Sequence, residues 1–285
     1  MDSLFRNSRR KLSQGLLFWR EVGAGIPVVF LHGSWNDSSQ WVSLMELLSP
    51  NFHCFAPDLF GFGESESPNI HHSIDLHVEC LAEFLQALKL ERVYLVGHSL
   101  GSWIAASYSL KYPEQVYGLV LISPEGIAIE GQQKRLQRMR LLVKLPPTLF
   151  QILRVLRPIT KIFGWDEQIA RDWKLRQAML NYPTACELLF QRQKSEIKAE
   201  LLQERLSSIL APVLILEGGK DSKEVLEMSR AYAQYLSQAE LKAIAHGAND
   251  LPESCAGIIA GDIRDFIKLT AIGDQFNSDQ FNSDQ

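Results

Sequence analysis

A series of short apolar runs, each followed closely by glycine or proline, constrains the fold of this 285-residue chain more than any other feature. The clearest are IPVVFL (26–31), FHCFA (52–56), VYLV (93–96), GLVLI (118–122) and VLIL (213–216). Such runs are typical of strands buried on both faces of a parallel sheet. Amphipathic helical patterns at 75–88, 100–112 and 222–236 lie between or after them. Strands alternating with helices predict a doubly wound, mostly parallel α/β fold, with an antiparallel edge strand at 16–21.

One long segment interrupts this alternation. The roughly ninety residues between the fourth and fifth runs have helical patterns, several prolines and no convincing strand. We therefore expect an α/β core formed by residues 15–125 and 209–270, with a helical cap inserted at 126–208. The end of the chain repeats the unit DQFNS and offers little to bury, which predicts a disordered, low-complexity tail at 271–285.

Composition and charge exclude several classes of protein. A net charge of −4 argues against a nucleic-acid partner, and no apolar run approaches the ~18 to 20 residues that span a bilayer. The apolar stretch Leu16–Trp19 is too short for the core of a signal peptide, so we expect a cytoplasmic protein. The four cysteines are scattered, which predicts reduced thiols and neither a metal site nor a cofactor built on them.

The pentapeptide GHSLG (97–101) puts Ser99 between a strand-like run and a helical pattern. Gly-x-Ser-x-Gly arises by chance in roughly one such chain in ten, so its context must decide. In a nucleophile elbow, flanking glycines let strand and helix approach closely, and a tight turn exposes the serine hydroxyl. A helix that begins at Leu100 would also point its amides at an anion formed there. Strand, turn and helix together predict that Ser99 is a nucleophile.

A serine hydroxyl needs a base, and the elbow fold supplies its triad in the chain order Ser, then Asp or Glu, then His. Of the seven histidines only His246 follows Ser99, just past a short strand-like segment at 241–245. His246 is therefore the predicted base, although His98 is the nearer histidine in sequence.

The acid is expected in a loop that follows a strand. VLILEGGKD puts Asp221 after the fifth run, where a carboxylate would fix the tautomer of His246 and stabilise its imidazolium form. Glu125, after the fourth run, stays open as the alternative, whereas Asp250 is too close to His246 in sequence. We predict Asp221 as the acid.

Acyl transfer also needs donors for the developing oxyanion. The amide of Leu100, directly after the nucleophile, is one candidate. The second is expected from the loop after the first run, where Gly33 allows close approach and Ser34 presents its amide. His32 would then support that loop rather than act as the base.

Taken together, five stretches make the chain resemble the α/β-hydrolase fold superfamily, in its lidded serine-hydrolase branch. They are LHGSW (31–35), APDLFGFGES (56–65), LVGHSLGSWIA (95–105), LILEGGKD (214–221) and AHGAND (245–250). The resemblance covers about residues 15–270 and implies hydrolysis of esters, thioesters or related bonds without a metal or organic cofactor. It also implies that Asp58 shapes a loop near the site. Three positions depart from the family pattern: Ser102, Gly247 and the Ser-Lys-Glu that follows Asp221.

The expected function is thus a carboxylesterase-like serine hydrolase that acts on a small, partly hydrophobic acyl substrate. Carbon–carbon bond hydrolysis, acyl transfer and ligand binding without catalysis stay open as alternatives.

Residues 126–180 carry eleven Lys or Arg and four Asp or Glu, a net charge of +7. We favour a lid with a solvated charged face over the alternative, weak contact with an anionic membrane surface. The histidines in HHSIDLHVE (71–79) are expected in a solvated loop and helix, not around a metal.

Overall fold

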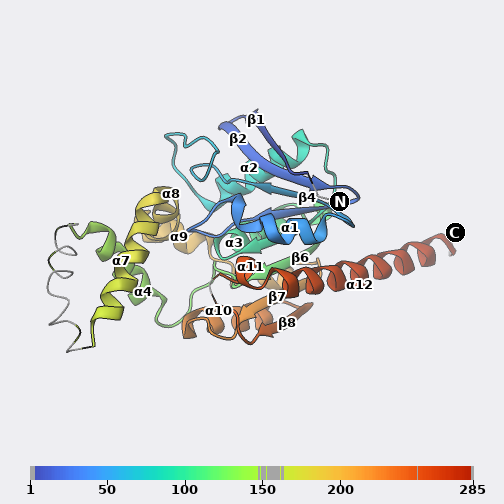
Figure 1. Ribbon diagram of the computed structural model, residues 1–285. Coiled ribbons are helices and arrows are strands. Elements are labelled where there is room, and N and C mark those ends of the chain that lie inside the picture. The colour runs from blue at the N-terminus through green and yellow to red at the C-terminus, as the bar shows by residue number, and fades with distance from the viewer. Residues whose placement is uncertain are drawn as a thin grey trace. The chain divides into compact units, whose positions relative to one another are not determined.

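A mostly parallel sheet organises the chain (Figure 1). The computed structural model describes residues 4–146, 164–248 and 250–283 and the single positions 148, 152 and 161, with backbone alone for 272–283. Within these residues eight strands pair in the order β1-β2-β4-β3-β5-β6-β7-β8. They are β1 (Arg6–Leu12), β2 (Gly15–Gly23), β3 (Ile26–Leu31), β4 (Phe52–Pro57), β5 (Val93–His98), β6 (Val116–Ile122), β7 (Val213–Gly218) and β8 (Ala239–Ile244). From β4 to β8 all neighbours are parallel, which confirms the predicted fold class.

The antiparallel end of the sheet corrects the expectation of an edge strand at 16–21. That stretch belongs to β2, which pairs with β4 on one side and with β1 on the other, so β1 is the edge. The β1 sequence RNSRRKL is almost entirely polar and exposed, and therefore carries no apolar signal that a sequence reading could detect. Charged side chains on an edge also discourage pairing with another chain.

Helices cover the two faces of the sheet. In the part of the chain outside 130–199 they are α1 (Val42–Leu48), α2 (Ile74–Ala87), α3 (Leu100–Lys111), α10 (Lys223–Tyr235), α11 (Leu251–Ser254) and α12 (Ala256–Ser283). Ser73 and Ser222 cap α2 and α10, where each side-chain oxygen accepts a backbone amide of the first turn. Alternate strand residues pack with α1 and α12 in one apolar cluster, which includes Phe30, Trp41 and Ile263. Leu31, on the opposite strand face, lines a small cavity together with Leu81 and Phe84 of α2.

The chain divides into two compact units, residues 1–129 with 200–285 and residues 130–199. The second unit contains α4 (Gln132–Lys144), α7 (Asp166–Asn181), α8 (Pro183–Cys186), the π-helical turn η3 (Glu187–Gln191) and most of α9 (Lys194–Glu200). No strand occurs among its described residues. It begins four residues and ends nine residues inside the cap range expected from the sequence, 126–208.

Helix α12 extends into the segment 271–285, for which the disorder expected from the sequence stays a prediction. The backbone of α12 is helical as far as Ser283, which includes most of the DQFNS repeat. A helix anchored in the core by Ile259, Ile263 and Ile267 can propagate, because each further residue adds one hydrogen bond without a new nucleation cost.

Candidate active site

The serine between β5 and α3 has an unusual backbone. Ser99 adopts φ 51° and ψ −111°, a conformation that costs an L-residue roughly 1 to 3 kcal/mol. Its amide donates to the Ile122 carbonyl at 2.9 Å, which fixes the turn against β6. The side chain is half-buried at the carboxyl edge of the sheet. The sequence motif thus forms the strand–turn–helix geometry of a nucleophile elbow.

The flanking glycines are required by close approach. A Cβ at Gly97 would lie 2.5 Å from the Gly101 backbone, and one at Gly101 would overlap the Leu31 carbonyl oxygen. Ser102, a departure from the family pattern, is fully buried, and its hydroxyl donates to the Gly97 carbonyl at 2.6 Å. Ser102 therefore stabilises the elbow through a hydrogen bond to the Gly97 carbonyl that a glycine at position 102 could not make.

Asp221 lies in the loop after β7, two strands from Ser99 in the sheet. Its Oδ2 accepts from the Ser123 hydroxyl at 2.9 Å and from the Gly218 amide at 3.1 Å. Its Oδ1 is buried and has no hydrogen-bond partner among the described residues. Burial raises the pKa of Asp221, opposed by those two hydrogen bonds. Oδ2 is thus held in place by two hydrogen bonds, whereas Oδ1 can accept a hydrogen bond from a further donor.

Ser123 is a site residue that the sequence reading missed. It directly follows β6, has a positive φ of 44°, and its amide donates to the Leu216 carbonyl at 2.9 Å. The available signal was a polar residue at the carboxyl end of the strand between those of Ser99 and Asp221.

His246 lies in an exposed turn after β8. The turn contacts the Asp221 loop through its backbone: Lys220 donates to the Gly247 carbonyl and Gly219 to the Ile244 carbonyl, both at 2.9 Å. Within the described residues no hydrogen bond joins the His246 imidazole to Asp221 or to Ser99. The structure therefore brings the two loops together but not the side chains.

Gly247, another departure from the family pattern, has a steric cause. A Cβ there would overlap the side chain of Leu251, which is fully buried in the core. A bulky residue after the histidine is incompatible with this packing. Asn249, the next polar residue of that motif, lies outside the described residues.

The loop after β3 lies directly against the elbow. A Cβ at Gly33 would be 2.7 Å from His98 Nδ1, so only glycine allows this approach. Ser34 is buried, and the Gly33 amide donates to Gln40 Oε1 at 3.0 Å. Leu100 is the first residue of α3, where the helix provides no acceptor for its amide. The two predicted oxyanion donors thus lie on adjoining segments.

Two other histidines near the elbow are structural. His32 Nδ1 lies 2.9 Å from the Gly33 carbonyl, and its Nε2 accepts from the Leu59 amide at 3.0 Å, so it ties two loops together. His98 Nδ1 accepts from Gln40 Nε2 at 2.8 Å. Burial lowers the pKa of His32, and burial followed by the neighbouring His32 lowers the pKa of His98 to about 4. Both are buried and neutral at pH 7, so neither has the accessibility of a general base.

The remaining acidic candidates occupy distinct positions. Glu125 follows β6, where its amide donates to the Ser99 carbonyl at 3.3 Å and its carbonyl accepts from the Tyr232 hydroxyl at 2.5 Å. Asp250 starts α11 and is exposed. Asp58 is buried and accepts the Ser38 and Glu64 amides at 2.6 and 2.7 Å, as expected of a residue that shapes a loop.

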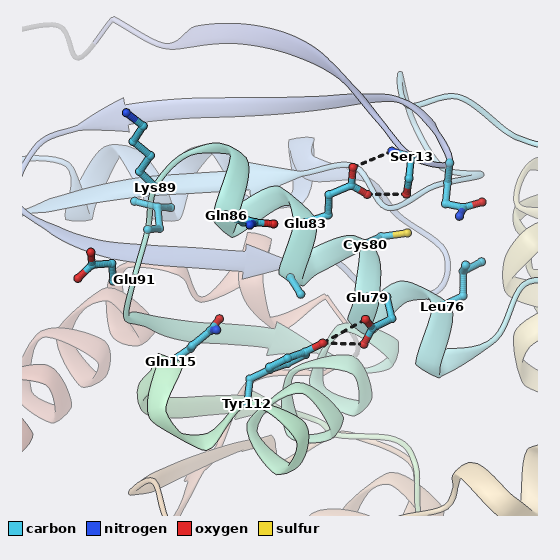
Figure 2. Close-up of a pocket in the computed structure, with 13 residues that line it drawn as sticks. Ser13, Leu76, Glu79, Cys80, Glu83, Gln86, Lys89, Glu91, Tyr112 and Gln115 are labelled. Atoms are coloured by element: carbon cyan, nitrogen blue, oxygen red, sulfur yellow. Dashed lines mark hydrogen bonds between the residues drawn. The ribbon is translucent and has the colours of Figure 1, made fainter.

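A cavity of about 720 Å³ lies elsewhere, between the β1–β2 turn, α2 and the end of α3 (Figure 2). The carboxylates of two of its acidic side chains are bonded to its walls: Glu83 to Ser13 at 2.6 and 2.7 Å, and Glu79 to the Tyr112 hydroxyl at 2.9 Å. It contains none of the predicted site residues, so we do not place the reaction there.

Two further kinds of site are relevant in the described part of the chain: a metal site and a membrane-spanning helix. There, no group of three or more His, Cys, Asp or Glu side chains is arranged to hold a metal ion. All four cysteines are free. None of the described helices is both long and apolar enough to cross a bilayer.

A parallel sheet with a strained serine between strand and helix defines the class of fold, and the family comparison agrees. The chain belongs to the alpha/beta hydrolase fold family, whose model matches residues 26–252. Solved structures agree over nearly the whole chain. A thermophilic esterase from Thermogutta terrifontis has a TM-score of 0.71 at 21% identity, covering 93% of this chain and 99% of that one. The meta-cleavage product hydrolase CumD has a TM-score of 0.72 at 21% identity, covering 92% and 97%.

Curated relatives match over shorter stretches. The 2-hydroxy-6-oxo-2,4-heptadienoate hydrolase of Pseudomonas putida is 39% identical over 114 residues, 39% of this chain and 41% of that protein. The mouse (Mus musculus) 1-acylglycerol-3-phosphate O-acyltransferase ABHD5 is 37% identical over 115 residues, 39% of this chain and 33% of that protein. The matched stretch thus spans less than half the length of each relative.

Proposed function

We propose that this protein is a serine hydrolase that cleaves a carboxylic ester or a related acyl substrate through an acyl-enzyme. Ser99 Oγ attacks the carbonyl carbon while His246 takes its proton, and the amides of Ser34 and Leu100 hold the oxyanion. The intermediate then expels the leaving alcohol, which receives that proton. A water activated by His246 next attacks the acyl-enzyme and releases the acid.

The observation that carries this proposal is the strained backbone of Ser99. A glycine would adopt φ 51° without steric cost, so a serine there has to be useful for its hydroxyl. The strain lies at the carboxyl edge of the sheet, beside the start of α3. Strain at such a position is typical of a functional group held for reaction.

The buried, unpartnered Oδ1 of Asp221 supports the role of His246. Since Oδ2 already has two donors, Oδ1 is the natural acceptor for an imidazole N–H. His246 is exposed, so the reaction requires its side chain to turn from solvent towards Asp221. We assign the acid role to Asp221 rather than to Glu125 because only Asp221 lies in the loop that contacts the His246 turn.

Labelling tests the nucleophile directly. A fluorophosphonate probe should modify the wild type and fail to modify Ser99→Ala. The matched control is Ser107→Ala, a serine further along α3, which should label like the wild type. A folded wild-type protein that stays unlabelled would favour a non-catalytic, ligand-binding member of the fold.

The bond class is tested with substrates. We expect hydrolysis of p-nitrophenyl esters, with kcat/KM rising as the acyl chain lengthens, and loss of that activity in His246→Ala. One relative is named for 2-hydroxy-6-oxo-2,4-heptadienoate, so carbon–carbon bond hydrolysis is the alternative on the same residues. Turnover of that dienoate without turnover of any ester would replace our proposal with it. Acyl transfer is tested by adding an alcohol acceptor and measuring the new ester.

A second candidate concerns the unit 130–199, which has fourteen Lys or Arg against six Asp or Glu, a net of +8. Leu141 and Trp165 are exposed among these basic residues. This mixture would suit an acyl substrate with an anionic head group at a lipid surface, and another relative is named for 1-acylglycerol-3-phosphate. Cosedimentation with anionic vesicles, but not with zwitterionic ones, and release by salt would support it. Equal recovery with both vesicle types would contradict it.

A further inference from the structure

A single buried side chain joins the loop after β3 to the nucleophile elbow. Gln40, in the 3₁₀ turn η1 (Ser38–Trp41), is 3% exposed. Its Oε1 accepts the Gly33 amide at 3.0 Å and its Nε2 donates to His98 Nδ1 at 2.8 Å. The two bonded groups belong to residues directly before Ser34 and Ser99. Gln40 is thus bonded next to both a proposed oxyanion donor and the proposed nucleophile.

Only a side-chain amide suits both bonds at once. The Gly33 amide is a donor and requires an acceptor, whereas neutral His98 presents Nδ1 as an acceptor and requires a donor. This bond also fixes the tautomer of His98, with its proton on Nε2. An apolar residue would leave both groups unpaired, and a carboxylate would satisfy both only if His98 carried a proton on Nδ1.

The link determines which amide of the loop can serve an oxyanion. Because Gln40 occupies the Gly33 amide, the next amide, that of Ser34, is the one left to stabilise negative charge. His98 lies against Gly33 so closely that no Cβ fits between them. The position of the Ser34 amide relative to the start of α3 therefore depends on the pair Gln40–His98.

A carboxylate extends this link towards the His246 turn. Glu253 in α11 accepts from Gln40 Nε2 at 3.4 Å and from Asn36 Nδ2 at 2.6 Å. Helix α11 begins five residues after His246. Gln40 thus contacts the loop with the proposed oxyanion donor, the nucleophile elbow, and the helix that follows the His246 turn.

We propose that Gln40 is a positioning residue, which holds the oxyanion loop and the nucleophile elbow in fixed register through Gly33 and His98. This role rests on the proposed function of Ser99. Gln40 acts on the transition state alone, because oxyanion donors contact charge that develops only there. The readouts should therefore be kcat and its pH dependence, not KM.

The test compares Gln40→Glu with Gln40→Leu, and uses Gln86→Glu, an exposed position on α2, as the control. Both Gln40 variants should lower kcat about 10- to 100-fold at pH 7.5 with KM nearly unchanged, and Gln86→Glu should match the wild type. In Gln40→Glu a protonated His98 can donate to the new carboxylate. The ratio of its kcat to that of the wild type should therefore rise as the pH falls, while the ratio for Gln40→Leu stays flat.

NMR of ¹³C-labelled histidine provides a readout independent of activity. The groups that act on His98 are Gln40, His32, Asp250 and, through Gln40, Glu253. His98 should stay neutral down to about pH 5 in the wild type and titrate at least one pH unit higher in Gln40→Glu. Folding of each variant is checked by its near-ultraviolet circular dichroism.

The outcomes separate the two proposals. An active wild type with unchanged kcat in Gln40→Leu would overturn the role of Gln40 and leave that of Ser99 intact. An unchanged His98 titration in Gln40→Glu would overturn the link itself. A wild type that neither labels nor hydrolyses any substrate would overturn the proposed function and, with it, the role in positioning.

Discussion

At the scale of single residues, Asp221 shows a conflict between stability and reactivity. Its buried carboxylate has one oxygen without a partner, and burial raises its pKa. An uncompensated buried acceptor destabilises the folded state. Such a cost is common at sites that await a second group, which in the proposed function is the imidazole of His246.

We therefore expect Asp221→Asn to lower kcat about 10⁴-fold while the melting temperature stays equal or rises. Asparagine keeps an oxygen for Ser123 and Gly218 but removes the charge that orients and stabilises an imidazolium. Steady-state kinetics and calorimetry at pH 7.5 check the two effects. Loss of activity in Glu125→Gln, with Asp221→Asn active, would move the acid to Glu125.

The residues of the site differ in how far the sequence predicted them. Ser99 was recognisable because a motif, a strand and a helix coincide. Ser123 and Gln40 were not, because a hydroxyl or amide that bonds across the fold leaves no local pattern. The exposed conformation of His246 was equally unpredictable, since chain order shows which histidine is available but not where its ring points.

At the scale of secondary-structure elements, the close contact of α3 with β3 sets the position of the elbow. Gly101 allows it, because the Leu31 carbonyl occupies the space that a Cβ would fill. Backbone atoms cannot move aside as a flexible side chain can. The start of α3 can therefore lie this close to β3 only because Gly101 has no Cβ.

Gly101→Ala should destabilise the protein by about 2 kcal/mol or more and abolish fluorophosphonate labelling. The matched control is Gly261→Ala in α12, where a Cβ meets nothing within 4 Å. That change should stabilise the protein by about 0.5 to 1 kcal/mol, because alanine favours a helix interior. Urea unfolding measures both. A Gly101→Ala protein with wild-type stability would show that the helix can shift.

The predictability of elements follows from their burial. β3, β5 and β7 are apolar on both faces and were located closely from sequence, whereas exposed β1 was missed. An alternating or continuous apolar pattern indicates a buried strand, and β1 was missed because it buries little.

At the scale of the whole molecule, buried titratable groups have opposing effects on stability. His32 and His98 have lowered pKa values, so unfolding takes up protons and stability falls as the pH drops below about 6.5. Glu217, Asp221 and Glu253 have pKa values raised by burial, so they oppose that loss as the pH falls. The change of the unfolding free energy with pH is the sum of these opposing contributions, so removing one group by mutation should change it.

His98→Asn should reduce the loss of unfolding free energy between pH 7 and pH 5 by about 2 kcal/mol relative to wild type. The sign follows from the pKa of His98, about 4 in the folded protein and near 6.5 when unfolded. Urea titrations of both proteins at the two pH values measure it. Parallel slopes would mean that His98 is solvated and not buried.

The left-handed backbone at Ser99 has a consequence for stability. Strain makes serine a worse residue than glycine for folding, so Ser99→Gly should stabilise the chain as it removes the hydroxyl. In a protein that did not need the proposed reaction, this exchange would benefit the fold. If Ser99 is the proposed nucleophile, the need for its hydroxyl outweighs the stability that a glycine would add at this position.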